Sequence, residues 1–267
     1  MEVPMSVDMR LTTLGHWSNS SAGPTTSFHV AADDAQILLD VGLDPIGRLQ
    51  AAGLQPTDVT HVYVSHLHSD HVGGFANFVF TRTLLNREGD VPLLKLTVLG
   101  HPQVLVGLKA LLDLQYPERT FDLAWVECGE EPVSLGGQLK ARLVPTDHPV
   151  PCYGVVLETG RAKIGFTGDT GPLASHQQDY AGCDVLIGEA FGLAGDVGDS
   201  IHRRGHSTAE DLGELVNAAR PRFVVPFHFG QEYADTSKRA KLLSACGAPD
   251  VQVVDPVDSE QITIAQS

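Results

Sequence analysis

Short apolar runs alternate with amphipathic segments along almost the whole chain. Runs of roughly four to eight apolar or alternating residues, closed by Gly or polar residues, are typical of buried strands. Between residues 138 and 169 three such runs are separated only by short polar stretches, which indicates strands joined by tight turns. The pattern predicts strands over 9–15, 26–31, 35–42, 58–66, 94–101, 138–148, 152–159, 162–169, 183–191, 222–228, 251–255 and 261–265.

Helical signals fall between these strands. Ser207 with Glu210 three residues later predicts a capping box, and the apolar positions that follow share one helical face. The start and stop signals predict helices over 44–53, 102–115, 207–220 and 236–246. Because strands and helices interleave without a linker, we expect one α/β domain over residues 1–267, with two layered sheets covered by helices.

Composition narrows the class of protein. The 267 residues are 42% apolar and 19% charged, with a net charge of −15. Such a charge disfavours nucleic-acid backbones and anionic membranes. The start of the chain lacks a basic segment followed by an apolar one, and we expect neither a signal peptide nor a membrane span. The cysteines form no CxxC pair and indicate reduced, buried thiols in a cytoplasmic protein: Cys128, Cys152, Cys183 and Cys246.

The stretch "VSHLHSDHVGG" concentrates titratable side chains directly after an apolar strand. His66 and His68 are two residues apart, so in an extended segment both imidazoles point the same way and can bind one ion. Asp70 and His71 follow where the chain turns, and can face a neighbouring site. The two glycines after them allow close approach of the backbone to a metal ion or substrate.

Three later residues share one context, the end of an apolar strand. His148 ends "LKARLVPTDH", Asp169 ends "AKIGFTGD" and His228 ends "RFVVPFH". Zn²⁺ takes about four nitrogen or oxygen ligands, so a histidine-rich loop needs donors from elsewhere in the chain. We expect these three side chains to complete a metal site at one edge of a sheet.

The loop residues and the three strand-end residues, taken in their order along the chain, resemble the ligand set of the metallo-β-lactamase-fold hydrolases. The resemblance covers nearly the whole chain. The resemblance implies an αββα sandwich of two mixed sheets flanked by helices, and two divalent metal ions. Zn²⁺ suits these donors, with Mn²⁺ or Fe as alternatives. Such a centre supplies an activated water, which Asp70 can also orient. The implied ligands are His66, His68 and His148 for one ion, Asp70, His71 and His228 for the other, and Asp169 between them.

A second resemblance concerns the bond that is broken. The strand end at Glu189 and the segment "GHSTAED" resemble ribonuclease Z and its phosphodiesterase relatives, as does "DHPVPCYGVVLE". By that resemblance Glu189 orients His206, which donates a proton to a phosphoryl oxygen or to the leaving alkoxide. The chain departs from ribonuclease Z between His148 and Asp169, where only a tight turn replaces the long arm that holds tRNA.

We therefore expect a small-molecule substrate, a small or cyclic phosphodiester or nucleotide, and no tRNA. The alternative is hydrolysis of a lactone or thioester at the same two-metal centre. A non-catalytic metal-binding module is a third hypothesis, but its signature would be a missing ligand.

Further residues have weaker signals. Asp40 in "LLDVG" resembles the family's strand-end aspartate and is expected to support the ligands. His202, Arg203 and Arg204 are candidates for phosphate binding, although a solvated loop is the simpler interpretation. Trp17 and Phe191 are candidates for an aromatic wall or for ordinary packing. The segment 75–93 has no clean period and suggests a flap or a homodimer surface.

Overall fold

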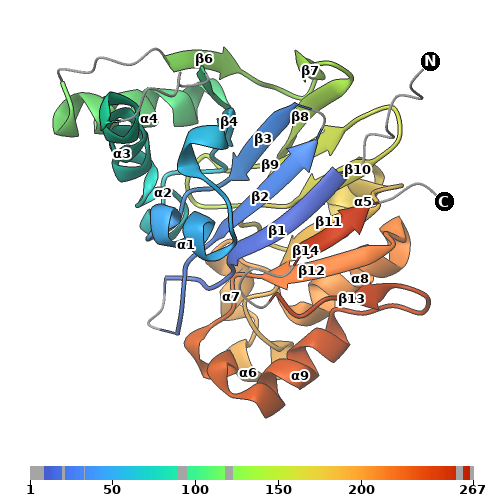
Figure 1. The fold of residues 1–267 in the computed structure, drawn as a ribbon. Helices are drawn as coiled ribbons and strands as arrows, with labels where there is room; N and C mark the ends of the chain where they lie inside the picture. Colours follow the sequence, from blue (N-terminus) through green and yellow to red (C-terminus); the bar gives the residue numbers. More distant parts are fainter. Residues whose placement is uncertain are drawn as a thin grey trace.

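Two seven-stranded sheets lie face to face in the computed structural model, which describes residues 9–19, 22–32, 34–88, 95–117, 123–256 and 261–264. In both sheets, four neighbouring strands run parallel and the remaining pairs are antiparallel. The layers form the two sheets covered by helices that the pattern predicts, and their mixed strand directions agree with the αββα sandwich that the resemblance implies (Figure 1).

The first sheet uses the N-terminal strands and the last strand of the chain. In spatial order it contains β14 (Gln261–Ile264), β1 (Met9–Gly15), β2 (Ser27–Ala32), β3 (Ala35–Leu39), β4 (His61–Tyr63), β5 (Leu96–Gly100) and β6 (Leu123–Glu127). Its outer face is covered by α1 (Pro45–Ala51), α3 (Phe75–Glu88) and α4 (Pro102–Gln115). The short helices η1 (Pro56–Asp58) and α2 (Ser69–Val72) lie on the connections around β4.

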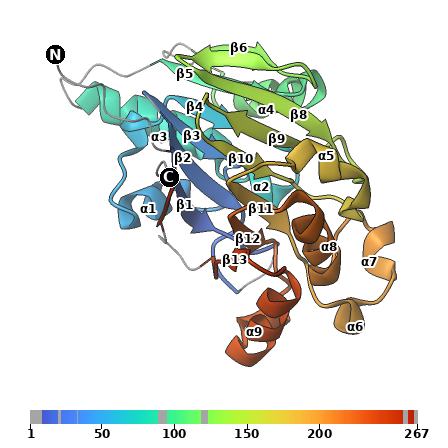
Figure 2. The same cartoon turned by 90° about the vertical axis from the view of Figure 1, so that its right-hand side faces the viewer.

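The second sheet is built from the middle and the C-terminal part. In spatial order it contains β13 (Gln252–Val253), β12 (Phe223–Phe227), β11 (Val185–Glu189), β10 (Lys163–Phe166), β9 (Tyr153–Glu158), β8 (Leu139–Pro145) and β7 (Val133–Gly136). Its helices are η2 (Leu173–His176), α5 (Gln177–Tyr180), α6 (Ala194–Val197), α7 (Ser200–Arg203), α8 (Ala209–Ala219), η3 (Gln231–Ala234) and α9 (Thr236–Ala245). Figure 2 shows α8 and α1 on opposite sides of the paired sheets.

Three apolar layers follow from this order. The central layer lies between the sheets, where residues such as Phe28, Phe166 and Phe227 have no exposed surface. The outer layers pack the first sheet against α1, α3 and α4, and the second against α5, α8 and α9. Sheets buried on both faces consist of near-continuous apolar strands, which explains why the runs in the sequence rarely alternate strictly.

Four local predictions need correction. The capping box lies one residue later than expected: Thr208 is the N-cap of α8 and Asp211 closes the box. Ser207 instead donates to the carbonyls of Thr170 and Gly171, both at 2.8 Å.

The strand predicted over 58–66 is three residues long, because Ser65 and His66 already belong to the site loop. The paired glycines also have another role, since a Cβ on Gly74 would collide with the carbonyl of Gly42 rather than approach the metal donors.

The segment 75–93 is the fourth correction. Residues 75–88 form α3, whose Phe75, Phe78 and Val79 are buried in the outer layer of the first sheet. This part is therefore a packed helix and not a flap, and residues 89–93 lie outside the described ranges. Strands β6 and β7 were not predicted, although β6 contains the apolar run LAWV; both are short, half-buried strands at the edges of their sheets.

Candidate metal centre and pocket

Polar side chains gather where strands of both sheets end at one edge of the sandwich. In α/β sheets, ligands bind outside the carboxyl ends of the parallel strands, and the parallel pairs β3–β4 and β10–β11–β12 end here. The strands deliver, in chain order, Asp40 after β3, His66 after β4, His148 after β8, Asp169 after β10, Glu189 at the end of β11 and His228 after β12.

The loop after β4 supplies four of the donors as its sequence predicts. His66 and His68 precede the single turn of α2, and their ring centroids lie 4.6 Å apart. Asp70 and His71 belong to α2 itself. All four except His68 are buried, so this stretch brings polar groups into the interior. Buried ionisable groups are costly unless they pair or bind a cation.

The donor atoms form compact groups shared between the two sheets. One group consists of His66, His68, His148 and Asp169, and another of Asp70, His71 and His228; within each, the ligand atoms lie within 4.8 Å of one another. Asp169 connects them, since its carboxylate lies 3.2 Å from the Nε2 atoms of both His71 and His228. The seven residues expected as ligands are therefore all brought together.

The orientation of the imidazoles fits a cation. Nδ1 of His148 donates to the carbonyl of Gly205 at 2.8 Å, and Nδ1 of His71 donates to Asp40 at 2.6 Å. Each ring therefore turns the lone pair of Nε2 toward the donor group. Among the described residues, Nε2 of His66, Nε2 of His71 and both oxygens of Asp169 are buried without a hydrogen-bond partner. A divalent cation bound there would satisfy these atoms.

The charges of the group are strongly coupled. Burial raises the pKa of Asp169, but cationic His228 and His71 outweigh burial and hold it well below the usual range. Burial lowers the pKa of His228, but Asp169, Asp70 and Glu189 raise it to about 10. Burial, reinforced by the neighbouring charge of His71, holds the pKa of His66 well below its usual value. Without a cation, therefore, protons on His71 and His228 balance the carboxylates.

Two residues at this edge have left-handed backbone conformations. Asp40 has φ of 58° and His228 has φ of 69°. Such conformations cost non-glycine residues about 1 kcal/mol or more and persist where the surroundings impose them. Asp40 also accepts from the backbone N–H and the hydroxyl of Ser65, both at 2.7 Å. Its expected role in supporting the ligands agrees with these contacts, because it fixes His71 and the start of the site loop together.

Glu189 connects a candidate catalytic residue to a metal donor. Its Oε1 accepts from Nδ1 of His206 at 2.6 Å and lies 3.0 Å from Nδ1 of His228. Its Oε2 accepts from the backbone N–H of Thr170 at 2.6 Å. The predicted Glu189–His206 pair is therefore present, and His206 also lies 3.8 Å from Asp169. The link to His228 could not be read from the sequence, since it depends on how β11 and β12 pair.

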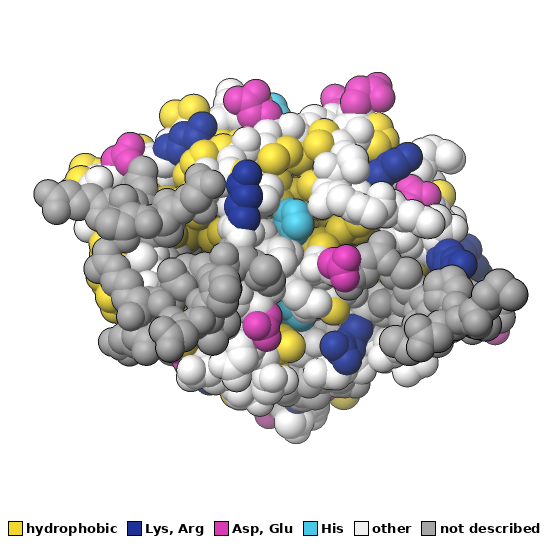
Figure 3. Space-filling view, turned by 45° about the horizontal axis from the view of Figure 1, so that its top comes forward, with side chains coloured by type: hydrophobic (Ala, Val, Ile, Leu, Met, Phe, Trp, Pro, Cys, Tyr) yellow, Lys and Arg dark blue, Asp and Glu magenta, His cyan; other side chains and the backbone are white. Residues whose placement is uncertain are grey.

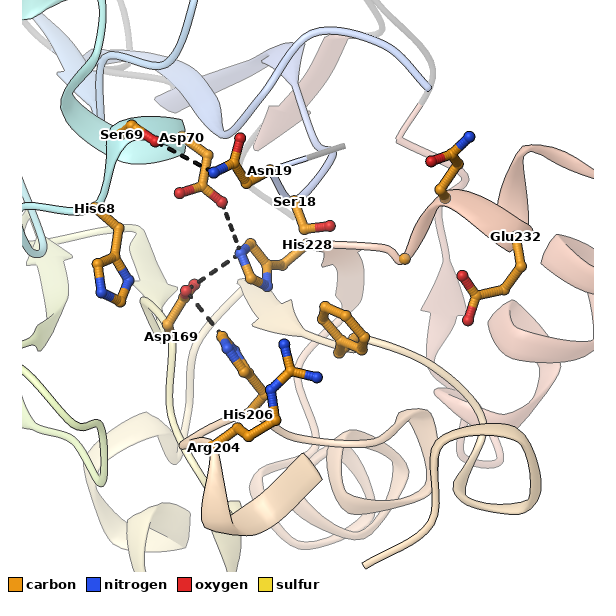
Figure 4. Close-up of a pocket in the computed structure, with 13 residues that line it drawn as sticks. Ser18, Asn19, His68, Ser69, Asp70, Asp169, Arg204, His206, His228 and Glu232 are labelled. Carbon is orange, nitrogen blue, oxygen red and sulfur yellow. Dashed lines mark hydrogen bonds and ion pairs between the residues drawn. The ribbon is translucent and has the colours of Figure 1, made fainter. Parts of the chain in front are cut away.

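A pocket of about 440 Å³ opens onto these donors (Figure 4). Of the weaker candidates, Phe191 and Arg204 line the pocket, with the Arg204 guanidinium 5.8 Å from the ring centroid of Phe191. Trp17 is buried against Phe229 instead, so it belongs to the core. The pocket is lined by Ser18, Asn19, His68, Ser69, Asp70, Asp169, Phe191, Arg204, His206, His228, Gly230, Gln231 and Glu232.

Two other phosphate-binding candidates lie elsewhere. His202 pairs with Asp211 of the α8 capping box at 2.7 Å, and Arg203 does not line the pocket. Conversely, the sequence interpretation missed Asn19 and Glu232. Asn19 lies in a polar loop with no motif, and it donates to Ser69 at 3.3 Å. Glu232 has one usable signal, which is its position four residues after the strand-end His228.

Comparison with known proteins identifies the class. Residues 35–229 match the family described as beta-lactamase superfamily domain, a range that contains every donor named above. The chain belongs to this superfamily. It is 30% identical over 254 residues to ribonuclease Z of Pyrobaculum calidifontis, an alignment covering 84% of this chain and 87% of that enzyme. With the donor groups at the sheet edge, this membership defines the chain as a metallohydrolase.

Solved structures share the fold. Human tRNase Z, short form, superposes with a TM-score of 0.75 at 20% identity, covering 96% of this chain and 99% of that one. A diphosphatase from the PhnP family superposes with a TM-score of 0.70 at 15% identity, covering 97% and 98%. Within the described ranges, no helix is long and apolar enough to cross a membrane. All four cysteines are buried and free, as expected.

Proposed function

We propose that the chain is a phosphodiesterase that hydrolyses a small or cyclic phosphodiester with two divalent metal ions, Zn²⁺ being the ion that suits the donors best. One ion is assigned to His66, His68 and His148, the other to Asp70, His71 and His228, with Asp169 shared. When bound, such a pair of ions provides an activated water at neutral pH and neutralises charge on the reacting phosphate.

The observation that carries the proposal is the Glu189–His206 pair beside the shared carboxylate. Because Nδ1 of His206 donates to Glu189 at 2.6 Å, its Nε2 remains available for the substrate. From this position a protonated His206 can donate a proton from Nε2 to a phosphoryl oxygen or to the departing alkoxide. A carbonyl substrate has less need of this donor, because its negative charge develops on one oxygen beside the ions.

The remaining side chains orient the reaction. Asp70 lies 3.2 Å from Nε2 of His228 and opens into the pocket, where it can accept a hydrogen bond from the attacking water. Arg204 provides a guanidinium at the pocket wall, which suits the oxygens of a phosphate. Phe191 excludes water on the side of His206, with ring centroids 5.4 Å apart.

The size of the substrate follows from what surrounds the pocket. Strands β9 and β10 are joined by a turn of residues 159–162, in which Thr159 and Ala162 bond each other, so the chain has no protruding arm between His148 and Asp169. On the face in Figure 3, Lys and Arg are scattered singly among acidic side chains. With a net charge of −15, these features support a small substrate over tRNA.

The test is a substrate panel on metal-loaded enzyme and on the variant His206→Ala. We expect metal-dependent turnover of bis-p-nitrophenyl phosphate or cyclic nucleotides, reduced on the order of 10²- to 10³-fold in the variant. Turnover of lactones or thioesters with no phosphodiester activity, and indifference to His206→Ala, would instead establish the alternative. Cleavage of tRNA precursors at rates above those of the small diesters would overturn the size argument.

A further inference from the structure

The pocket extends beyond the metal donors to an end at Glu232 that has no role in the hydrolytic step. Figure 4 shows Glu232 at the end of the pocket away from Asp169 and His68. The half-buried ring of Phe191 also lines this pocket, beside His206. An aromatic face and a carboxylate therefore border the space next to the reacting phosphate.

Both side chains stand on a connected support. The backbone N–H of Gly230 donates to the carbonyl of Phe191 at 2.9 Å, which ties the loops after β11 and β12 together. Tyr233 is buried; its hydroxyl accepts from the N–H of Leu193 at 2.7 Å and donates to Asp196 at 2.9 Å. The backbones that carry Phe191 and Glu232 are thus held in one arrangement.

The carboxylate of Glu232 is folded toward this support. A Cβ on Gly230 would come within 2.8 Å of Oε2 of Glu232, so the absence of a side chain at residue 230 makes room for it. Among the described residues that line the pocket, Arg204 is the single Lys or Arg. The charge at the far end is therefore negative, and a second phosphate there would be repelled.

We infer that Phe191 and Glu232 form a nucleoside subsite, an inference that rests on the proposed phosphodiesterase function. A base or sugar stacks on Phe191, as bases do on aromatic side chains, and Glu232 accepts hydrogen bonds from ribose hydroxyls or from an amino group of the base. The preferred substrate carries one phosphate and one nucleoside. Oligonucleotides are poor substrates, because their next phosphate must pass Glu232.

The test compares two diesters that differ in hydrogen-bond donors: adenosine 3′,5′-cyclic phosphate has hydroxyl and amino donors, and bis-p-nitrophenyl phosphate has none. We expect Glu232→Ala to lower kcat/KM about tenfold for the nucleotide and to leave the other diester within about twofold. Glu232→Gln should retain part of the difference, because its carbonyl still accepts. Phe191→Ala should lower both, since both substrates present an aromatic ring.

Two nucleotide analogues identify the substrate group that donates a hydrogen bond to Glu232, and one control variant tests for an effect of charge alone. The 2′-deoxy analogue removes a hydroxyl and the inosine analogue removes the amino group; the group responsible is the one whose loss makes the nucleotide insensitive to Glu232→Ala. Glu131→Ala removes the same charge from the exposed loop between β6 and β7 and should change neither rate. Equal effects of Glu232→Ala on both diesters, or none, overturn the subsite alone. If the unchanged enzyme hydrolyses neither of the two diesters, the proposed function and the subsite are overturned together.

Discussion

The two ends of the pocket are built differently. At the donor end, most side chains are buried and three of the imidazoles are held by a defined partner: Asp40 holds His71, Gly205 holds His148 and Glu189 holds His206. At the far end, Gln231 and Glu232 are exposed, and only their backbones are held. A group that performs chemistry needs fixed geometry, whereas a group that selects a substrate can be exposed. Substitutions at the donor end should therefore have large effects, and those at the far end small, substrate-dependent ones.

The largest effect is expected from Asp169→Ala. The residue connects both donor groups, and its loss leaves the cationic forms of His71 and His228 without their shared carboxylate. We expect turnover to fall by at least about 10³-fold, with bound metal reduced in elemental analysis of the purified variant. Retained activity with a full metal content would show that the carboxylate is not shared.

Glu189→Gln distinguishes the metal centre from the proton donor. His206→Ala removes only the donor, and should leave metal affinity unchanged. Glu189 contacts both His206 and His228, so Glu189→Gln should lower kcat and also weaken metal binding by about 10-fold or more. Competition with a chromophoric chelator measures the affinities. Equal metal affinity in the two variants would mean that the contact with His228 has no energetic role.

Asp40→Asn tests the support beneath the ligands. The change removes the charge that fixes His71, so we expect metal affinity to fall about 10- to 100-fold, while activity at saturating metal recovers most of its value. Asp44 is a matched control, because it also has a left-handed conformation, with φ of 57°, but lies outside the donor groups at the start of α1. Asp44→Asn should leave metal affinity unchanged.

The pH dependence of the metal-free protein should report His228. Its pKa of about 10 lies above the ordinary value of 6.5, so the protonated ring contributes stability that is complete below pH 6.5 and lost as the pH rises through about 10. We expect the melting temperature of the chelator-treated protein to fall between about pH 6.5 and about pH 10, and to fall by less in His228→Gln. Metal binding near neutral pH should release protons, which calorimetry in buffers of different ionisation enthalpy measures. Binding without proton release would contradict the assigned charge state.

The smallest effect concerns a residue near the site that has no part in the chemistry. Thr208→Ala removes the N-cap of α8 and should cost about 1 kcal/mol of stability, with little change in kcat. Denaturant unfolding measures it, and a loss of activity larger than the loss of folded protein would show that the cap also positions His206.

Most of the donor end could be predicted from the sequence. Histidines and aspartates that end apolar strands are typical of sites built on a sheet edge, and the carboxyl ends of parallel strands converge on one edge, so their meeting could be expected. At the far end, Phe191 was a candidate for an aromatic wall and does line the pocket. Glu232 could not be predicted, because it comes near Phe191 through the pairing of β11 with β12, which leaves no local pattern. The cap of α8 was misplaced by one residue because both Ser207 and Thr208 suit an N-cap, and tertiary contacts decided between them.

The most direct measurement is a titration of metal-free protein with Zn²⁺ while hydrolysis of bis-p-nitrophenyl phosphate is followed. The proposed centre predicts turnover that rises to a plateau at two ions per chain, and the same binding stoichiometry in His206→Ala with turnover lower by on the order of 10²-fold or more. A plateau at one ion per chain, or turnover that does not depend on metal, would contradict the proposed two-metal centre.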